Sequence, residues 1–199
     1  MIGLTGPTGA GKSEVARVWK SLGCEVIDAD ELSRKAVQPQ TSCFSALVER
    51  FSSAILASDG TLDRKALASI AFSTPENTRD LNAIVHPAVI RMVNERLEKA
   101  LLSGQTTAVI DAPLLFEAGL SEQCDVTVAV LAPVDQRLRR ICKRDGLTNE
   151  QAMKRIRVQP LDDYYRDRAT KILTNDGDAE TLAQKAQRLL TELGVPTNA

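Results

Sequence analysis

Apolar and polar residues follow one another along this chain in the blocks expected of an α/β protein. Five short apolar runs rich in β-forming residues predict strands near residues 1–5, 24–27, 106–111, 125–131 and 171–174. The stretches between them carry apolar residues at helical spacing, for example Val15, Val18, Trp19 and Leu22. Short apolar strands that alternate with helices predict a doubly wound parallel sheet of about five strands, with ligands at the carboxyl ends of the strands.

A long helical stretch from about residue 31 to 104 interrupts this alternation. Asp63 is expected to cap a helix that runs to Phe72. Thr74-Pro75-Glu76 has the sequence of a helix start, whereas His86-Pro87 is expected to break that helix and to begin a new one at Pro87. An all-helical insertion between two strands is where we expect the specificity for an acceptor substrate to lie.

The last third of the chain predicts three further helices. Asp135 is expected to cap an arginine-rich helix that ends at Asp145-Gly146. Thr148 and Gln151 have the spacing of a capping box for the next helix, which Pro160 closes. The final helix is expected over residues 178–193.

The first strand leads directly into a phosphate-binding pattern. Residues 6–13 read Gly-Pro-Thr-Gly-Ala-Gly-Lys-Ser and fit G-x-x-x-x-G-K-[ST]. The glycines allow backbone N–H groups to face a phosphate chain, Lys12 reaches the β- and γ-phosphates, and the Ser13 hydroxyl is a Mg²⁺ ligand. A merely flexible turn has no need of the Lys-Ser pair, so the sequence predicts binding of a nucleoside triphosphate.

Composition narrows the class of protein. The 199 residues include 25 Lys and Arg against 26 Asp and Glu, and a net charge of −1 argues against a general nucleic-acid or anionic-membrane surface. The four cysteines are scattered and the chain has one histidine, so we expect no zinc site, no disulfide framework and a reducing cytoplasm. The chain also shows no signal peptide or membrane-spanning pattern.

Asp28 and Asp30 close the second predicted strand. Asp30 is a candidate base that accepts the proton of an attacking hydroxyl, or a Mg²⁺ ligand through water, but it also suits the N-cap of a helix from Glu31 to Val37. Asp111 ends another strand and resembles a Mg²⁺-assisting acid, although a strand-end Asp is common in any α/β fold. For His86, capping or packing is favoured over catalysis.

Arginines are concentrated on the helix after the fourth strand. At ~100° per residue, Arg137, Arg140 and Arg144 fall within roughly 60° of one another, while Arg139 points away. Such a cluster is suited to clamp phosphoryl oxygens, and a solvated basic face is the alternative. Arg155 on the following helix is a candidate for the same clamp.

Several motifs in this order are similar to those of the dephospho-coenzyme A kinase family, nearly from end to end. They are the segments 9–13 (GAGKS), 26–30 (VIDAD), 59–62 (DGTL), 81–87 (LNAIVHP), 113–117 (PLLFE) and 144–145 (RD). The resemblance implies ATP-dependent phosphorylation of the ribose 3′-hydroxyl of dephospho-coenzyme A. It also implies a phosphate-loop kinase fold with a helical insertion and a helical lid.

The resemblance further implies roles for individual residues. Residues 1–30, 105–133 and 169–199 would form the nucleotide-binding core, 31–104 the coenzyme A domain and 134–168 the lid. Asp30 would be the base, with Lys12 and Arg140 also catalytic. The ATP-binding set would be Gly9, Ala10, Gly11, Lys12, Ser13, Glu14, Arg144, Asn175 and Gly177, of which Asn175 and Gly177 lie near the adenine. The acceptor set would be Arg34, Leu114, Leu115 and His86, and the Mg²⁺ set Ser13 and, through water, Asp30.

The expected partners are therefore ATP with Mg²⁺ and the small-molecule acceptor, handled by a cytoplasmic monomer. Two positions depart from the family pattern: Pro7-Thr8 replaces a more usual Gly-Ile, and Thr174 stands where an acidic residue is frequent. Two rivals remain open at this point. One is a nucleoside or nucleotide kinase of the same fold, and the other is a nucleotide-dependent switch, against which the absence of an N-K-x-D stretch counts.

Overall fold

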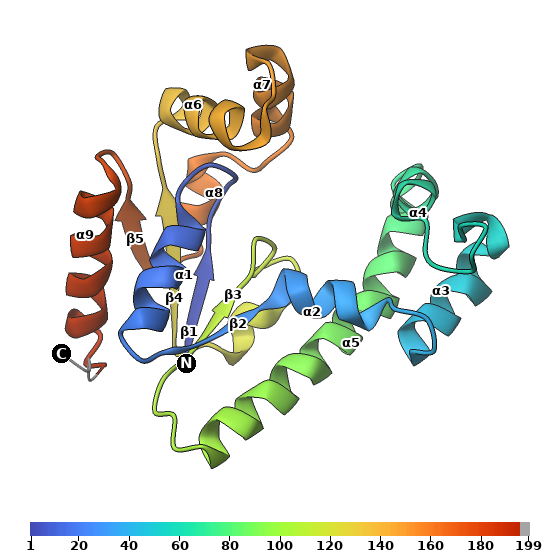
Figure 1. Ribbon diagram of the computed structural model, residues 1–199, viewed down its shortest axis with the longest axis horizontal. Coiled ribbons are helices and arrows are strands. Elements are labelled where there is room, and N and C mark those ends of the chain that lie inside the picture. The colour runs from blue at the N-terminus through green and yellow to red at the C-terminus, as the bar shows by residue number, and fades with distance from the viewer. Residues whose placement is uncertain (196–199) are drawn as a thin grey trace. The chain divides into compact units, whose positions relative to one another are not determined.

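The computed structural model describes residues 1–195, which include a five-stranded, all-parallel sheet (Figure 1). The strand order is β2-β3-β1-β4-β5. The strands are β1 (Ile2–Thr5), β2 (Glu25–Asp28), β3 (Ala108–Asp111), β4 (Val126–Leu131) and β5 (Lys171–Thr174). All five coincide with the predicted apolar runs, so the doubly wound α/β prediction is confirmed.

β1 is the middle strand and is buried along its whole length. It pairs with β3 on one side, where Leu4 is opposite Asp111, and with β4 on the other. Helices α1 (Lys12–Ser21) and α9 (Ala179–Glu192) pack against each other beside the sheet. The fully buried Trp19 of α1 donates its indole N–H to the carbonyl oxygen of Ala186 in α9, at 2.9 Å. The phosphate loop therefore leaves the sheet from its middle, fully buried strand.

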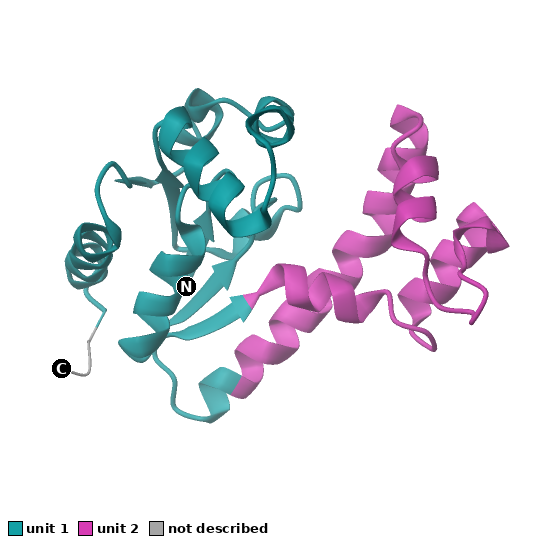
Figure 2. Cartoon of the chain, turned by 45° about the horizontal axis from the view of Figure 1, so that its top comes forward, with its two compact units in different colours: residues 1–27, 100–199 teal, residues 28–99 magenta. Residues whose placement is uncertain are grey.

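The chain divides into two compact units, coloured separately in Figure 2. Unit 1 comprises Met1–Ile27 and the chain from Ala100 onward, and contains the sheet. Unit 2 is Asp28–Lys99, which is mostly helical. Its helices are α2 (Ala29–Ala36), α3 (Ser42–Phe51), the 3₁₀ turn η1 (Ser53–Ile55), α4 (Arg64–Ala71) and most of α5 (Pro75–Leu102). The predicted caps of α4 and α5 are confirmed, because Asp63 and Thr74 accept backbone N–H groups there.

The start of α2 differs from the prediction. The helix begins at Ala29, and its N-cap is Asp28, whose side chain accepts the N–H of Glu31 at 2.9 Å. The expectation that Asp30 caps this helix is therefore wrong, because Asp30 already lies in its first turn. Either aspartate has the right chemistry for a cap, and only the extended backbone of Asp28 decides between them.

The break expected at His86-Pro87 is also wrong. α5 runs without interruption over 28 residues with Pro87 inside it. Proline removes one helical hydrogen bond and crowds the preceding turn, at a cost of roughly 3 kcal/mol. The buried residues Ala88, Val89 and Val93 follow it directly, and such packing stabilises a helix more than local propensity does.

The part of the chain after β3 contains one further correction and two elements that the sequence does not predict. α6 (Val134–Asp145) begins directly after Pro133, so Asp135 lies in its first turn and is not the predicted cap. The Thr148 capping box of α7 (Asn149–Arg157) is confirmed. α8 (Asp162–Arg166) and the 3₁₀ turn η2 (Leu120–Gln123) were not predicted, because elements this short carry no periodicity. Within residues 1–195 no helix is long and apolar enough to span a membrane.

Candidate active site

The phosphate loop connects β1 to α1, and its glycines allow two other elements to approach it closely. Gly9 and Gly11 have φ of +77° and +105°, which side-chain-bearing residues adopt at a cost. A Cβ on Gly9 would lie 2.9 Å from the backbone oxygen of Arg137 in α6, and one on Gly11 would lie 2.4 Å from Nδ2 of Asn175. These glycines therefore serve the packing of the loop against the protein as well as the access of a phosphate.

Lys12 of the loop forms an ion pair with Asp111, the last residue of β3. The two side chains are 16% and 11% exposed, respectively, so the pair is largely shielded from water. The parallel pairing of β1 and β3 brings them together, since Asp111 is opposite Leu4, just before the loop. Asp111 thus takes a more direct part in the site than its weak sequence signal indicated. An incoming phosphate group must compete with Asp111 for Lys12.

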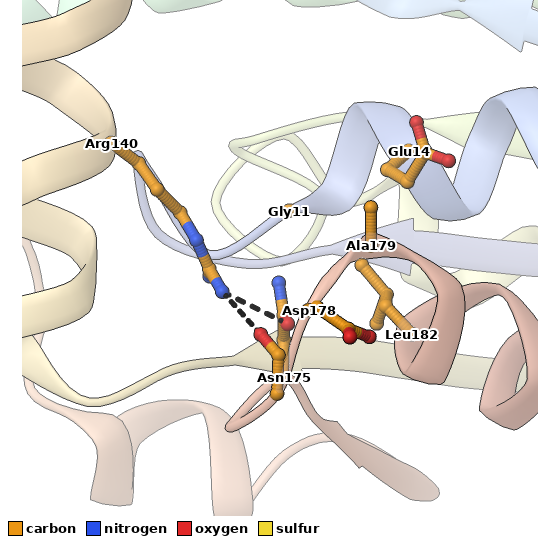
Figure 3. Close-up of a pocket in the computed structure, with 8 residues that line it drawn as sticks. Gly11, Glu14, Arg140, Asn175, Asp178, Ala179 and Leu182 are labelled. Atoms are coloured by element: carbon orange, nitrogen blue, oxygen red, sulfur yellow. Dashed lines mark hydrogen bonds between the residues drawn. The ribbon is translucent and has the colours of Figure 1, made fainter.

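A pocket of about 320 Å³ lies beside the loop (Figure 3). It is lined by Gly11, Glu14, Arg140, Asn175, Gly177, Asp178, Ala179 and Leu182. Five residues predicted for nucleotide binding or catalysis lie on the wall of this pocket: Gly11, Glu14, Arg140, Asn175 and Gly177. A sixth, Lys12, follows Gly11 directly in the chain. Glu14 also pairs with Arg17, and the hydrogen bond from Arg17 lowers the pKa of the Glu14 carboxyl group.

Arg140 of α6 reaches this pocket and is held there by several acceptors. Its Nη2 donates to Oδ1 of Asn175 at 3.1 Å and to the carbonyl oxygen of Gly177 at 3.2 Å (Figure 3). Its Nη1 is 3.4 Å from the carbonyl oxygen of Gly9. Gln136, one turn earlier in α6, accepts a further bond at 2.9 Å. The solvated-face interpretation therefore does not describe Arg140.

The other arginines of the predicted clamp lie in different surroundings. Arg137 is buried, which lowers its pKa, and donates to Thr8 and Gln159. Arg144 is exposed and hydrogen-bonds Asp145, which also pairs with Arg155. These bonds lower the pKa of Asp145 to about 2, and the bond from Arg144 has the largest effect. Neither Arg144 nor Arg155 lines the pocket.

Asn175, which is predicted to lie near the adenine, lines the pocket beside the loop. Its side chain is buried, and Nδ2 donates to the carbonyl oxygen of Ala10 at 2.7 Å. Because Oδ1 accepts from Arg140, both ends of this amide are occupied by the protein. Gly177 presents backbone to the pocket instead. The sequence gives no signal for Gln159, the partner of Arg137, because a single glutamine in a turn belongs to no motif.

The predicted acceptor residues fall into three environments. Leu114 is 57% exposed, whereas Leu115 is fully buried and packs against Gly3, where a Cβ would lie 2.8 Å from its Cδ2. Leu115 is therefore a core residue that supports Leu114 and has no surface for a ligand. Arg34 is exposed in the last turn of α2, and His86 is half-buried in α5; both belong to unit 2. Asp30 is exposed in the first turn of α2.

The donors suited to Mg²⁺ are few, as expected of an ion that travels with a nucleotide. Ser13 lies in the first turn of α1 beside Lys12, and Asp111 supplies a carboxylate at the neighbouring strand end. Within the described residues no three His, Cys, Asp or Glu side chains form a metal-binding group. Mg²⁺ commonly takes one or two protein oxygens and completes its shell with phosphates and water, so these donors fit it.

Comparison with known proteins decides the family. A family model described as dephospho-CoA kinase matches residues 1–181. The chain belongs to the dephospho-CoA kinase family. A relative named dephospho-CoA kinase from Halalkalibacterium halodurans is 41% identical over 177 residues, covering 89% of this chain and 88% of the relative. The similarity to the dephospho-CoA kinase family inferred from the motifs is thus confirmed.

Solved structures share the fold of this chain. A crystal structure of a Thermus thermophilus protein has a TM-score of 0.82 at 38% identity, covering 96% of both chains. A dephospho-CoA kinase from Campylobacter jejuni, at 24% identity, shares the fold with a TM-score of 0.70 over 96% of both chains. The fold is that of the phosphate-loop kinases.

Proposed function

We infer that this chain transfers the γ-phosphoryl group of ATP to the ribose 3′-hydroxyl of dephospho-coenzyme A, which gives coenzyme A and ADP. The observation that carries this inference is the phosphate loop beside a pocket that Arg140 enters, in a chain of the dephospho-CoA kinase family. A loop that holds phosphates and a guanidinium held next to it supply the two things that phosphoryl transfer needs, positioning and positive charge.

The ATP subsite is proposed to extend from the loop into the pocket. The N-terminus of α1 and the loop N–H groups would bind the β- and γ-phosphates, with Lys12 leaving Asp111 to join them. The adenosine would occupy the pocket between Gly177 and the apolar Leu182. Arg140 would meet the γ-phosphoryl group, and Arg144, now bound to Asp145, would approach only on lid closure.

The acceptor side is proposed to come from unit 2 and from the segment after β3. Asp30 would take the proton of the attacking hydroxyl, and Arg34, His86 and Leu114 would hold the acceptor. The solvent exposure of Asp30, Arg34 and Leu114 supports these assignments. Unit 2 would then be the coenzyme A domain, and residues 134–168 the lid.

Mg²⁺ would be held by the hydroxyl of Ser13 and, through water, by Asp30. When bound, it would neutralise charge on the transferring phosphoryl group. Ser13 is suited to this because the first turn of α1 places it next to Lys12.

We also propose a cytoplasmic monomer. The four cysteines are all free thiols, the state that a reducing compartment maintains.

Dephospho-coenzyme A is expected to raise ADP formation far above the rate without acceptor, with coenzyme A as the product. The measurement is ADP release with ATP and Mg²⁺ across a panel that includes adenosine, AMP and dephospho-coenzyme A, with product identified by mass. A higher kcat/KM for adenosine or AMP would assign the chain to the rival kinase class. Slow turnover that no acceptor stimulates would favour the nucleotide switch.

Arg140→Lys is expected to lower kcat by about 10²-fold. A lysine keeps the charge but cannot bond the Asn175 and Gly177 oxygens while presenting a fork to the phosphoryl group. The matched control is Arg139→Lys on the same helix, whose side chain is 80% exposed and pairs only weakly with Asp135. Equal activity of the two variants in steady-state kinetics would contradict the role of Arg140.

A further inference from the structure

Three successive carbonyl oxygens of the phosphate loop are bonded by side chains from outside it. The carbonyl of Thr8 accepts from Nε of Arg137 at 3.0 Å, and that of Ala10 accepts from Nδ2 of Asn175 at 2.7 Å. Between them, the carbonyl of Gly9 lies 3.4 Å from Nη1 of Arg140. α6 and the segment after β5 thus hold one edge of the loop at consecutive residues.

These bonds determine where the loop directs its N–H groups. In a trans peptide the carbonyl of one residue and the N–H of the next point in opposite directions. The Thr8 carbonyl, held by Arg137 of α6, therefore turns the N–H of Gly9 away from α6, and the Ala10 carbonyl, held by Asn175, turns the N–H of Gly11 away from the segment after β5. Successive N–H groups directed to one side form the concave nest that binds phosphate oxygens.

Thr8 is held by both of its backbone polar groups. Its N–H donates to Oε1 of Gln159 at 3.0 Å, while its carbonyl accepts from Arg137. The same Oε1 atom also accepts from Nη2 of Arg137 at 3.0 Å, which closes a small ring of hydrogen bonds. Gln159 lies two residues after the end of α7 and reaches back to a residue 151 positions earlier in the chain.

Arg137 differs from Arg140 in what remains available to a ligand. Its side chain is only 3% exposed, with Nε on Thr8, Nη2 on Gln159 and Nη1 at 3.9 Å from Asp162. A guanidinium with all three nitrogens directed at protein oxygens in a buried position is not placed to clamp a phosphoryl group. Its position indicates that it acts on the loop itself.

We propose that Arg137 and Gln159 form a bracket on Thr8 that sets the phosphate loop for the β- and γ-phosphates of the nucleotide, and that neither residue contacts the nucleotide. This proposal rests on the use of ATP inferred above and assigns positioning residues to the same site. It removes Arg137 from the clamp expected from helical spacing and adds Gln159, which lies 22 residues further along the chain.

The test compares nucleotides that differ only in the phosphates they present. In Gln159→Leu, which keeps the size but removes the acceptor, the Kd values of ATP and ADP by titration calorimetry are expected to rise about tenfold. The Kd of AMP, which lacks the β- and γ-phosphates, is expected to change less than about twofold. In steady-state kinetics the KM for ATP should rise while that for dephospho-coenzyme A stays the same. A fold that is merely less stable would not separate these ligands.

Arg137→Lys keeps the buried charge but cannot reach Thr8 and Gln159 together, and the same selective loss is expected of it. Because both residues act through Thr8, the double variant should bind ATP only about tenfold to thirtyfold more weakly, not about 100-fold. Arg139→Lys is the control and should bind all three nucleotides normally. If Arg137→Lys does not fold, Gln159→Leu decides alone.

Two results would overturn the bracket. One is unchanged ATP and ADP affinity in Gln159→Leu, and the other is an equal loss for ATP, ADP and AMP. Both presuppose that the wild-type chain binds ATP. Wild-type protein that fails to bind ATP would instead refute the proposed function, so the two failures are distinguishable.

Discussion

Asp30→Asn is expected to lower kcat by roughly 10²–10⁴, the range for loss of a positioned general base. Asparagine keeps the shape of the side chain but cannot accept the proton of the attacking hydroxyl. The structure makes this test cleaner than the sequence suggested, because Asp30 lies inside the first turn of α2 and does not cap it. Stability, measured by thermal unfolding, should change by well under about 1 kcal/mol.

The neighbouring aspartate supplies the control. Asp28 is the cap, so Asp28→Ala should destabilise the protein by about 1 kcal/mol, whereas Asp28→Asn keeps the cap and should keep both stability and kcat. Asp30→Ala should lose activity without the melting loss of Asp28→Ala. Near-normal kcat in Asp30→Asn, together with a large loss in Asp28→Asn, would transfer the role of base to Asp28.

Lys12→Met is expected to lower kcat by at least ~10³, since the loop would lose its only point charge on the β- and γ-phosphates. Methionine retains most of the side-chain length. Single-turnover measurements at saturating ATP separate this loss from weaker binding. Wild-type-like turnover in Lys12→Met would contradict the assignment of residues 6–13 as a phosphate loop.

The ion pair with Asp111 requires a second variant for this prediction. Lys12→Met leaves the mostly buried carboxylate of Asp111 without its cation, which by itself destabilises the fold. Lys12→Met/Asp111→Asn removes that penalty and should melt higher than Lys12→Met, with no recovery of kcat. Recovery of kcat in the double variant would show that the defect of Lys12→Met was one of folding.

The sheet was predictable because its strands are short, apolar and separated by helices. Each of the five lies within two residues of its predicted limits at either end, and the caps at Asp63, Thr74 and Thr148 follow from local sequence. The errors at α2 and α5 have a common cause: sequence shows which residues are able to cap or break a helix, whereas packing decides which of them does. Asp28 and Pro87 are the two instances.

The site was predictable only as far as its motifs extend. The loop and Arg140 were selected from pattern and resemblance, and the structure brings them together. Helical spacing correctly predicts that Arg137 and Arg140 lie on one face of α6. It contains no information on which of the two is buried or on which oxygen atoms each side chain meets. Gln159 and Asp111 acquire their partners through contacts 151 and 99 positions distant, which no local pattern records.

The central place of β1 has a consequence for the order in which the molecule is made. Of the five strands of the sheet β1 is synthesised first, yet its partners β3 and β4 begin at residues 108 and 126. At ~5–20 residues per second, a ribosome needs on the order of ten seconds to supply them. The helices of unit 2 lie in that interval, and because helices form through contacts local in sequence, they are expected to fold first. The phosphate loop, which is synthesised before these partner strands, therefore takes its final form only after they have emerged.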